Sequence, residues 1–94
     1  MFYIYILKCS DGSFYTGHTE SLDKRISQHQ QAYFSNCYTA NRLPCELVYQ
    51  ASFDSRKQSL FIERQIRGWS RQKKRALIND DWIEIARLSR VKIS

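Results

Sequence analysis

The sequence predicts a mixed α/β domain, in which a small three-stranded sheet containing an antiparallel hairpin is flanked by helices. Near the start of the chain, two short runs rich in β-branched and aromatic residues stand on either side of a turn signal. A third such run follows a polar stretch, and capped amphipathic segments occupy the rest of the chain. The expected order is therefore β-β-α-β-α-α-α, and residues 1–94 are expected to form a single domain.

The first two strands are predicted over Phe2–Leu7 and Ser13–His18. If Asp11-Gly12 alone formed the turn, Tyr5 and Tyr15 would face opposite sides of the sheet. If Gly12 instead closes a three-residue loop in the left-handed conformation, both tyrosines share one face and Tyr5 stands opposite Gly17. The sequence Ser-Asp-Gly is typical of a type I turn closed by a glycine bulge, which favours the second register.

A first helix is predicted to begin after Ser21, whose hydroxyl can cap it. Leu22 and Ile26 are one turn apart and form its predicted buried stripe. Arg25 and His29 are also one turn apart and lie on the shoulder of that stripe, where a side chain is held by packing yet can reach a cleft. Taken singly, a snorkelling arginine and a histidine at a helix C-terminus are the simpler interpretations of these two residues.

The remaining elements follow an irregular polar stretch from Ala32 to Pro44. They are a strand over Glu46–Ala51, a long helix from Ser55 to about Trp69, a short helix over Lys73–Ile78 and a last helix through Ile83 to Leu88. Ser55-x-x-Gln58 is a capping pattern that predicts the start of the long helix. Asp81-x-x-Glu84 predicts the start of the last one in the same way.

The long helix carries a carboxylate beside its apolar stripe. Ile62, Ile66 and Trp69 have the spacing of a core stripe, and Glu63 falls at its edge. A carboxylate offers the oxygen ligands that a hard cation such as Mg²⁺ prefers, usually with several retained waters. The simpler interpretation is an exposed i, i+4 ion pair between Glu63 and Arg67.

Basic residues are concentrated in the second half of the chain. The net charge is +6, and from Ser55 onward eleven Lys or Arg stand against four Asp or Glu. A one-sided basic field suits a polyanion, because neutralising its phosphates releases condensed counterions. The charge pattern alone is equally compatible with a basic protein that binds no nucleic acid.

The cysteines and the apolar runs argue against other classes of protein. Cys9, Cys37 and Cys45 are an odd number without C-x-x-C spacing, so reduced cysteines in a cytoplasmic protein are expected, not a disulfide framework or a zinc site. The apolar run Phe2–Leu7 is too short to span a membrane and has no basic flank before it. Neither a membrane partner nor a signal peptide is therefore expected.

Taken together, these motifs resemble those of the GIY-YIG nuclease superfamily. The resemblance rests on Tyr3-Ile4-Tyr5, on Tyr15-Thr16-Gly17, on Arg25 and His29 in one helix, and on Glu63 in a longer helix. It covers the chain from Phe2 to about Asn79 and is closest to the short stand-alone bacterial branch, predicted endonucleases also called URI domains. Further similarities are Tyr38-Thr39, Arg42, Pro44, Trp69 and Lys73-Lys74. Two residues depart from the family name, Tyr3 in place of glycine and Thr16 in place of isoleucine.

The resemblance implies a metal-dependent endonuclease that hydrolyses phosphodiester bonds. Because a helical glutamate and waters hold one divalent ion in this family, Glu63 is the expected ligand of Mg²⁺ or Mn²⁺. The tyrosine of the second motif, Tyr15, is the expected base. Its usual pKa near 10 is high for this task, and a nearby Arg25 would lower that pKa while clamping the phosphate. Tyr5 would position water or phosphate, and His29 would hydrogen-bond a tyrosine or act as an auxiliary base. The side chains of all five residues are expected to converge over the same side of the sheet.

The expected substrate is nucleic acid, DNA in preference to RNA, cut with low or structure-based specificity because no second domain for sequence recognition is expected. No small-molecule cofactor is expected. The residues expected to contact the substrate are His18, Arg42, Arg67, Lys73 and Lys74. One alternative is a catalytically inactive nucleic-acid-binding module in DNA repair or recombination, and another is a domain whose basic half binds an acidic protein. The complete set of motif residues favours the nuclease.

Overall fold

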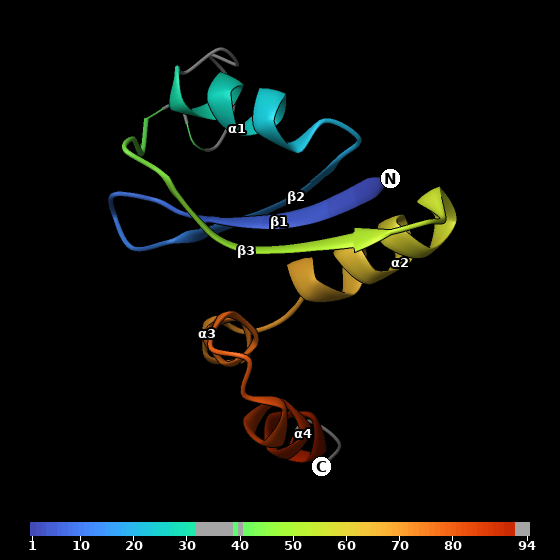
Figure 1. Ribbon diagram of the computed structural model, residues 1–94. Helices are drawn as coiled ribbons and strands as arrows, with labels where there is room; N and C mark the ends of the chain where they lie inside the picture. The colour runs from blue at the N-terminus through green and yellow to red at the C-terminus, as the bar shows by residue number, and fades with distance from the viewer. Residues whose placement is uncertain (32–38, 40, 92–94) are drawn as a thin grey trace.

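The computed structural model describes residues 1–31, 39 and 41–91, which form a three-stranded antiparallel sheet with helices on both faces (Figure 1). The elements are β1 (Phe2–Lys8), β2 (Phe14–Thr19), α1 (Leu22–Gln30), β3 (Glu46–Phe53), α2 (Arg56–Arg67), α3 (Arg71–Ile78) and α4 (Trp82–Val91). The strand order is β2-β1-β3, so β1 is central. This order confirms the predicted mixed α/β fold. β3 continues two residues beyond the predicted strand because Phe53 pairs with Phe2.

The β1–β2 hairpin has the register predicted from a three-residue loop. The Cys9 N–H donates to the Ser13 carbonyl at 2.8 Å, and Gly12 adopts a positive φ of 84°. A residue without a Cβ takes that conformation at little cost. In the resulting ladder Tyr5 lies opposite Gly17, so the tyrosines of the two motifs share one face of the sheet.

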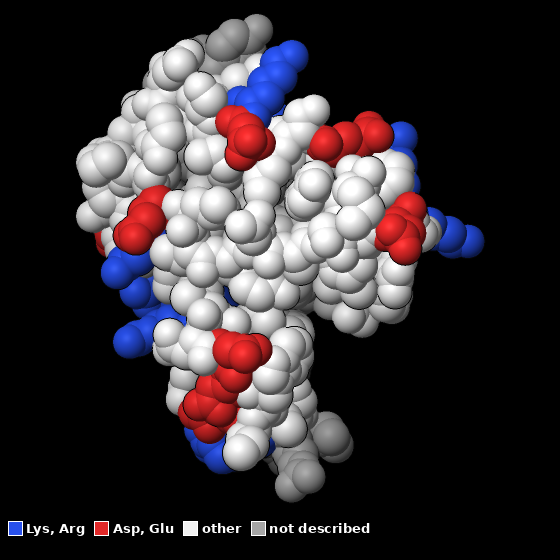
Figure 2. Space-filling model, viewed as in Figure 1, with Lys and Arg blue, Asp and Glu red and all other residues white. Residues whose placement is uncertain are grey.

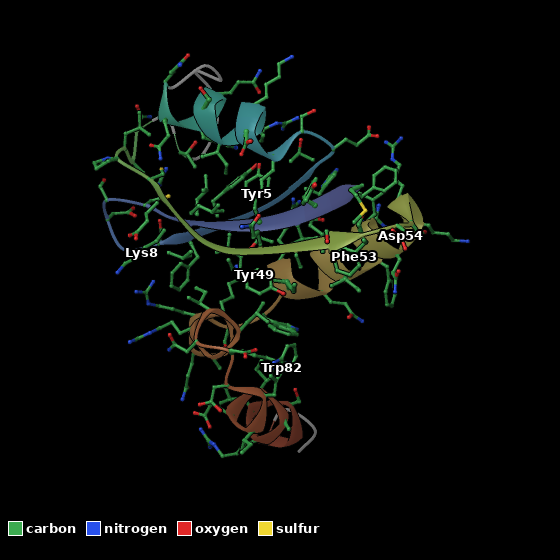
Figure 3. The ribbon with its side chains drawn as sticks, viewed as in Figure 1. Tyr5, Lys8, Tyr49, Phe53, Asp54 and Trp82 are labelled. Carbon is green, nitrogen blue, oxygen red and sulfur yellow. The ribbon has the colours of Figure 1, made fainter. Side chains whose placement is uncertain are left out.

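Side chains alternate along β1 and build a separate core on each face of the sheet. Ile4 and Ile6 belong to one core cluster with residues of α2, α3 and α4, whereas Tyr5 and Leu7 belong to a second cluster with residues of α1 packed against it. All four of these side chains are fully buried. Figure 1 shows α1 on one side of the sheet and α2 and α3 on the other, and Figure 3 shows Tyr5 and Tyr49 pointing to opposite sides.

Two of the predicted helix caps are present. The Ser55 hydroxyl accepts a hydrogen bond from the Gln58 N–H at 3.2 Å, and the Asp81 carboxylate accepts one from the Glu84 N–H at 3.1 Å. Each cap satisfies a backbone N–H that has no partner inside its own helix. α2 ends at Arg67, two residues earlier than predicted.

At two other helix starts the structure differs from the prediction, although α1 does begin after Ser21 as predicted. The Ser21 side chain makes no capping hydrogen bond; instead its backbone N–H donates to Thr19 Oγ1 at 3.1 Å, so the preceding turn orders this end of α1. α3 starts at Arg71 instead of Lys73, because Ser70 caps it through its hydroxyl. A lone serine is a weak signal, since its hydroxyl can bond equally well within a turn.

Two of the cysteines lie at the ends of the strands. Cys9 and Cys45 are buried free thiols with their sulfur atoms 3.7 Å apart, and Cys37 lies outside the described residues. None of the helices in the described part of the chain is both long and apolar enough to cross a membrane.

Candidate active site

An aromatic cluster lies between β1, β2 and α1. The ring centroids of Tyr5 and Tyr15 are 6.3 Å apart, and the His29 ring lies 5.8 Å from the first and 5.1 Å from the second. Tyr5 Oη is 3.0 Å from His29 Nε2, and Thr39 Oγ1 is 2.8 Å from His29 Nδ1. Both ring nitrogens are thus held by hydroxyl groups, which fixes the imidazole and, through it, the Tyr5 hydroxyl.

His29 is buried far more deeply than the pattern of α1 predicted. It is 2% exposed, whereas Leu22 and Ile26, the predicted buried stripe, are only half-buried. Because hydroxyl groups satisfy both ring nitrogens, a neutral imidazole can be buried at little cost. Burial lowers the pKa of His29 below its usual range, and the charge of Arg25 lowers that pKa further. The neutral form of His29 is therefore favoured.

Gly17 allows the Tyr5 ring to lie directly against β2. A Cβ atom added at Gly17 would stand 2.5 Å from both Cζ and Oη of Tyr5, well inside van der Waals contact. Only a residue without a side chain fits here, although the backbone at this position is not left-handed. The glycine of the second motif is therefore a packing requirement of the tyrosine in the first.

Replacing Gly17 with alanine is expected to push the Tyr5 hydroxyl away from His29 and to destabilise the fold by about 1–3 kcal/mol, the usual cost of overpacking a core. Denaturant unfolding measures this loss. Gly68→Ala is the matched control, because a Cβ there would meet its nearest atom at 3.6 Å and φ is −82°. That control is expected to leave stability unchanged or slightly raised. Equal denaturant midpoints for the two variants would contradict the inference that the Tyr5 ring needs a glycine at position 17.

Glu63 approaches the sheet from the other face. It lies on α2, and its side chain is 3% exposed, so it is as buried as the core residue Ile66. The prediction that it lies at the edge of the apolar stripe was therefore wrong. Arg67 Nη2 forms an ion pair with Glu63 Oε1, and His18 Nδ1 lies 3.9 Å from Oε2. Within the described residues, Oε1 accepts no hydrogen bond of good geometry. The predicted i, i+4 pair exists, but its carboxylate is buried.

A cleft of about 440 Å³ wraps around the edge of β2 and collects most of these side chains. Its lining includes Tyr5, Tyr15, Gly17 and His18 from the strands, Lys24, Arg25 and Gln28 from α1, and Arg56, Ser59 and Arg67 from α2. Glu63 lies behind this lining, one helical turn from both Ser59 and Arg67, and contacts His18. The aromatic cluster and the carboxylate therefore lie on opposite faces of the sheet, on the two sides of β2. The prediction that all five side chains converge over one side of the sheet was wrong, because α2 packs on the face opposite α1.

Three residues predicted to contact nucleic acid do not line this cleft. Arg42 pairs with Asp11 at 3.1 Å beside the hairpin loop. The ammonium group of Lys73 lies 4.2 Å from the centre of the Trp69 ring, and the pKa of Lys74 is lowered by burial and by a neighbouring arginine. Their contact with nucleic acid stays a prediction, whereas His18 and Arg67, from the same set, do line the cleft.

Two cleft cations, Lys24 and Arg56, were not singled out from the sequence. Lys24 directly precedes Arg25, and Arg56 stands seven residues before Glu63, which is two helical turns and therefore the same face of α2. The periodicity of α2 could have indicated Arg56 once Glu63 had been chosen. Figure 2 shows the side of the molecule that carries β3, where Lys and Arg appear mainly at the margins.

Comparison with known proteins shows the family to which the chain belongs. The sequence model described as the GIY-YIG catalytic domain matches residues 1–76. The chain belongs to the GIY-YIG family. This GIY-YIG chain is 46% identical over 78 residues to UPF0213 protein SSP2268 of Staphylococcus saprophyticus, an alignment that covers 83% of the chain and 94% of that protein. A UPF0213 protein of Staphylococcus aureus strain Mu3 is 38% identical with the same coverage.

A solved structure supports the fold of this GIY-YIG chain. The solution NMR structure of the UPF0213 protein BH0048 from Bacillus halodurans is 39% identical, with a TM-score of 0.55 over 84% of each chain. These findings confirm the family predicted from the two tyrosine motifs, their spacing, the helix with Arg25 and His29, and the helical Glu63. Membership implies a nuclease-type function and nucleic acid as the class of substrate. The names of the UPF0213 relatives specify neither a metal nor a substrate.

Proposed function

We propose that the protein is a metal-dependent endonuclease that hydrolyses phosphodiester bonds in DNA, with the cleft at the edge of β2 as its active site. The observation that carries this proposal is the buried carboxylate of Glu63. Among the described residues its Oε1 atom is engaged by the Arg67 guanidinium but accepts no hydrogen bond of good geometry, and the carboxylate lies behind a basic cleft lined by two phenols. A buried carboxylate in such surroundings is suited to a cation.

The residues present fit one Mg²⁺ or Mn²⁺ ion. Among the described residues, no three His, Cys, Asp or Glu side chains lie close enough together to hold a metal ion, so they form no cage made wholly of protein ligands. Mg²⁺ commonly takes one carboxylate and keeps several waters, which matches the single carboxylate of Glu63. When bound there, the ion would stabilise negative charge on the phosphoryl and leaving oxygens.

The side chains on the side of the sheet that α1 covers have complementary roles in the proposed reaction. Tyr15 lines the cleft and is the proposed base that takes a proton from the attacking water. The hydroxyl of Tyr5, held by His29 Nε2 at 3.0 Å, orients that water or a phosphate oxygen. Arg25 lines the cleft and holds the phosphate through its guanidinium. Hydrolysis adds water across the P–O bond and leaves one phosphate end and one hydroxyl end.

A cleavage assay tests this proposal directly. Single-stranded, duplex and branched DNA and the corresponding RNAs would be incubated with Mg²⁺, with Mn²⁺ or with a chelator. Cleavage of at least one DNA only when the metal is present is the expected result. Binding without cleavage on every substrate would contradict the proposal and favour an inactive nucleic-acid-binding module.

Affinity for DNA is expected to fall steeply with added salt. Four cations line the cleft, namely Lys24, Arg25, Arg56 and Arg67. Because Arg67 is paired with Glu63 when no metal is present, phosphate contacts from the other three correspond to a slope of about −2.7 in log affinity against log salt. Fluorescence anisotropy with a short duplex and chelator measures this slope. Arg56→Gln is expected to reduce its magnitude by about one.

The neighbouring cation provides the control for that measurement. Lys57 is exposed and lines a different hollow on α2, so Lys57→Gln is expected to leave the slope nearly unchanged. A flat salt profile in the wild type would contradict electrostatic binding in this cleft. Equal slopes for the Arg56 and Lys57 variants would place the phosphates elsewhere.

A further inference from the structure

Arg67 contacts both the proposed metal ligand and the cleft. Its Nη2 atom forms the ion pair with Glu63 Oε1 and lies 3.5 Å from the carbonyl oxygen of Thr16. The Arg67 side chain is 59% exposed, whereas that of Glu63 is 3% exposed. Since Arg67 also lines the cleft, one end of it reaches a buried carboxylate while the rest borders the space proposed for substrate.

The ion pair engages the same carboxylate oxygen that is left without a hydrogen bond. A buried carboxylate needs a positive charge close by, and without metal Arg67 supplies it. A divalent ion bound to Glu63 would supply that charge itself and would repel a guanidinium held at ion-pair distance. Arg67 and the metal therefore compete for one carboxylate.

The surroundings of Arg67 favour one destination for a displaced guanidinium. Burial lowers the pKa of Lys74, and the charge of Arg67 lowers it further, so these two cations are close enough to repel each other. The cleft lies on the exposed side of Arg67, and a phosphate there would accept two hydrogen bonds from the planar guanidinium. Movement toward a bound phosphate is thus electrostatically favourable.

We propose that Arg67 exchanges partners: it pairs with Glu63 in the metal-free protein and binds a substrate phosphate once a divalent ion has taken the carboxylate. This inference rests on the proposed function, because it assumes that Glu63 holds the metal. The exchange couples the two ligands. Metal binding releases Arg67 to bind phosphate and so raises the affinity for phosphate. By linkage, a bound phosphate that draws Arg67 away raises the affinity for metal by the same factor.

Titration calorimetry with Mn²⁺, in the absence of nucleic acid, tests the competition. Arg67→Gln is expected to bind Mn²⁺ about fivefold or more tightly than the wild type. Arg64→Gln is the matched control, because Arg64 is exposed on the same helix and lines the other hollow; it is expected to bind Mn²⁺ as the wild type does. Glu63→Gln is expected to lose the site.

The outcomes separate this inference from the proposed function. If Glu63→Gln loses Mn²⁺ binding but Arg67→Gln binds no more tightly than Arg64→Gln, the exchange is wrong and the metal site stands. If Glu63→Gln binds Mn²⁺ like the wild type, the metal site itself is wrong, and the exchange fails with it.

A second measurement follows the phosphate side. Binding of a short DNA duplex would be compared in chelator and in Ca²⁺, with the duplex checked on a gel to be intact. The gain in affinity caused by Ca²⁺ is expected to be larger in the wild type and in Arg64→Gln than in Arg67→Gln. Equal gains in all three proteins would overturn the coupling.

A third measurement uses only the wild-type protein, so it tests the exchange even if Arg67→Gln does not fold. The side-chain Nε–Hε resonances of Arg67 and Arg64 would be followed by NMR while Mg²⁺ is added to the wild-type protein. The Arg67 resonance is expected to move and the Arg64 resonance to stay in place. An Arg67 resonance that does not move at saturating Mg²⁺ would overturn the exchange.

Discussion

Replacing Glu63 with glutamine is expected to slow DNA cleavage by about 10³-fold or more in saturating Mg²⁺, because about 4 kcal/mol of transition-state stabilisation would be lost. Glutamine has nearly the same shape but no charge, so the change removes the proposed metal ligand with little change of volume at a position that is 2% exposed. Single-turnover rates on the DNA substrate that is cut best measure the effect.

Glu84→Gln is the control for this experiment, because it makes the same chemical change on α4. Glu84 pairs with Arg87 and does not line the cleft, so its variant is expected to cleave at the wild-type rate. Circular dichroism would confirm that both variants are folded. If Glu63→Gln cleaves as fast as Glu84→Gln, the assignment of Glu63 as metal ligand is wrong.

Replacing Tyr15 with phenylalanine is expected to lower turnover by about 10²-fold or more, while affinity for DNA stays nearly unchanged. The substitution removes only the hydroxyl group that is proposed to take a proton from water. The ring, whose centroid lies 5.1 Å from that of His29, can remain in the aromatic cluster. Turnover is measured in multiple-turnover assays, and affinity by anisotropy with chelator.

Tyr49→Phe is the matched control for Tyr15→Phe. Tyr49 faces the opposite side of the sheet, where burial and then the charge of Asp80 raise the pKa of its hydroxyl (Figure 3). It does not line the cleft, and its variant is expected to turn over like the wild type. Reduced affinity with unchanged turnover in Tyr15→Phe would make Tyr15 a contact residue and not the base.

The part of the site formed by the hairpin could be predicted because it depends on local turn chemistry. Gly12 closes a three-residue loop, that loop determines the register, and the register places Tyr5 and Tyr15 on one face. Each step involves residues close together in the sequence. The strand assignments and the turn were therefore enough to predict that the two tyrosines of the candidate site share one face. The family followed once Arg25, His29 and Glu63 were added to the two motifs.

How deeply the side chains of Glu63 and His29 are buried could not be predicted, because their burial depends on partners far away in the sequence. Helical periodicity identifies the face of α1 that is apolar, but the hydroxyls that allow His29 to be buried come from β1 and from Thr39. Likewise, the pattern of α2 does not indicate that this helix packs beside the outer strand. The cleft lining contributed by Lys24 and Arg56 follows from that packing, which only the three-dimensional arrangement shows.

The position of the cleft also bears on how the protein avoids associating with itself. Within the described sheet, β2 has no strand on its outer side, and such a border is a template on which a second chain can add a strand and begin to aggregate. The Arg67 guanidinium covers one carbonyl of this border, and Lys24 and Arg25 stand nearby in the cleft lining. Two copies approaching border to border would bring like charges together, so the charges that attract a polyanion also oppose fibril-like stacking.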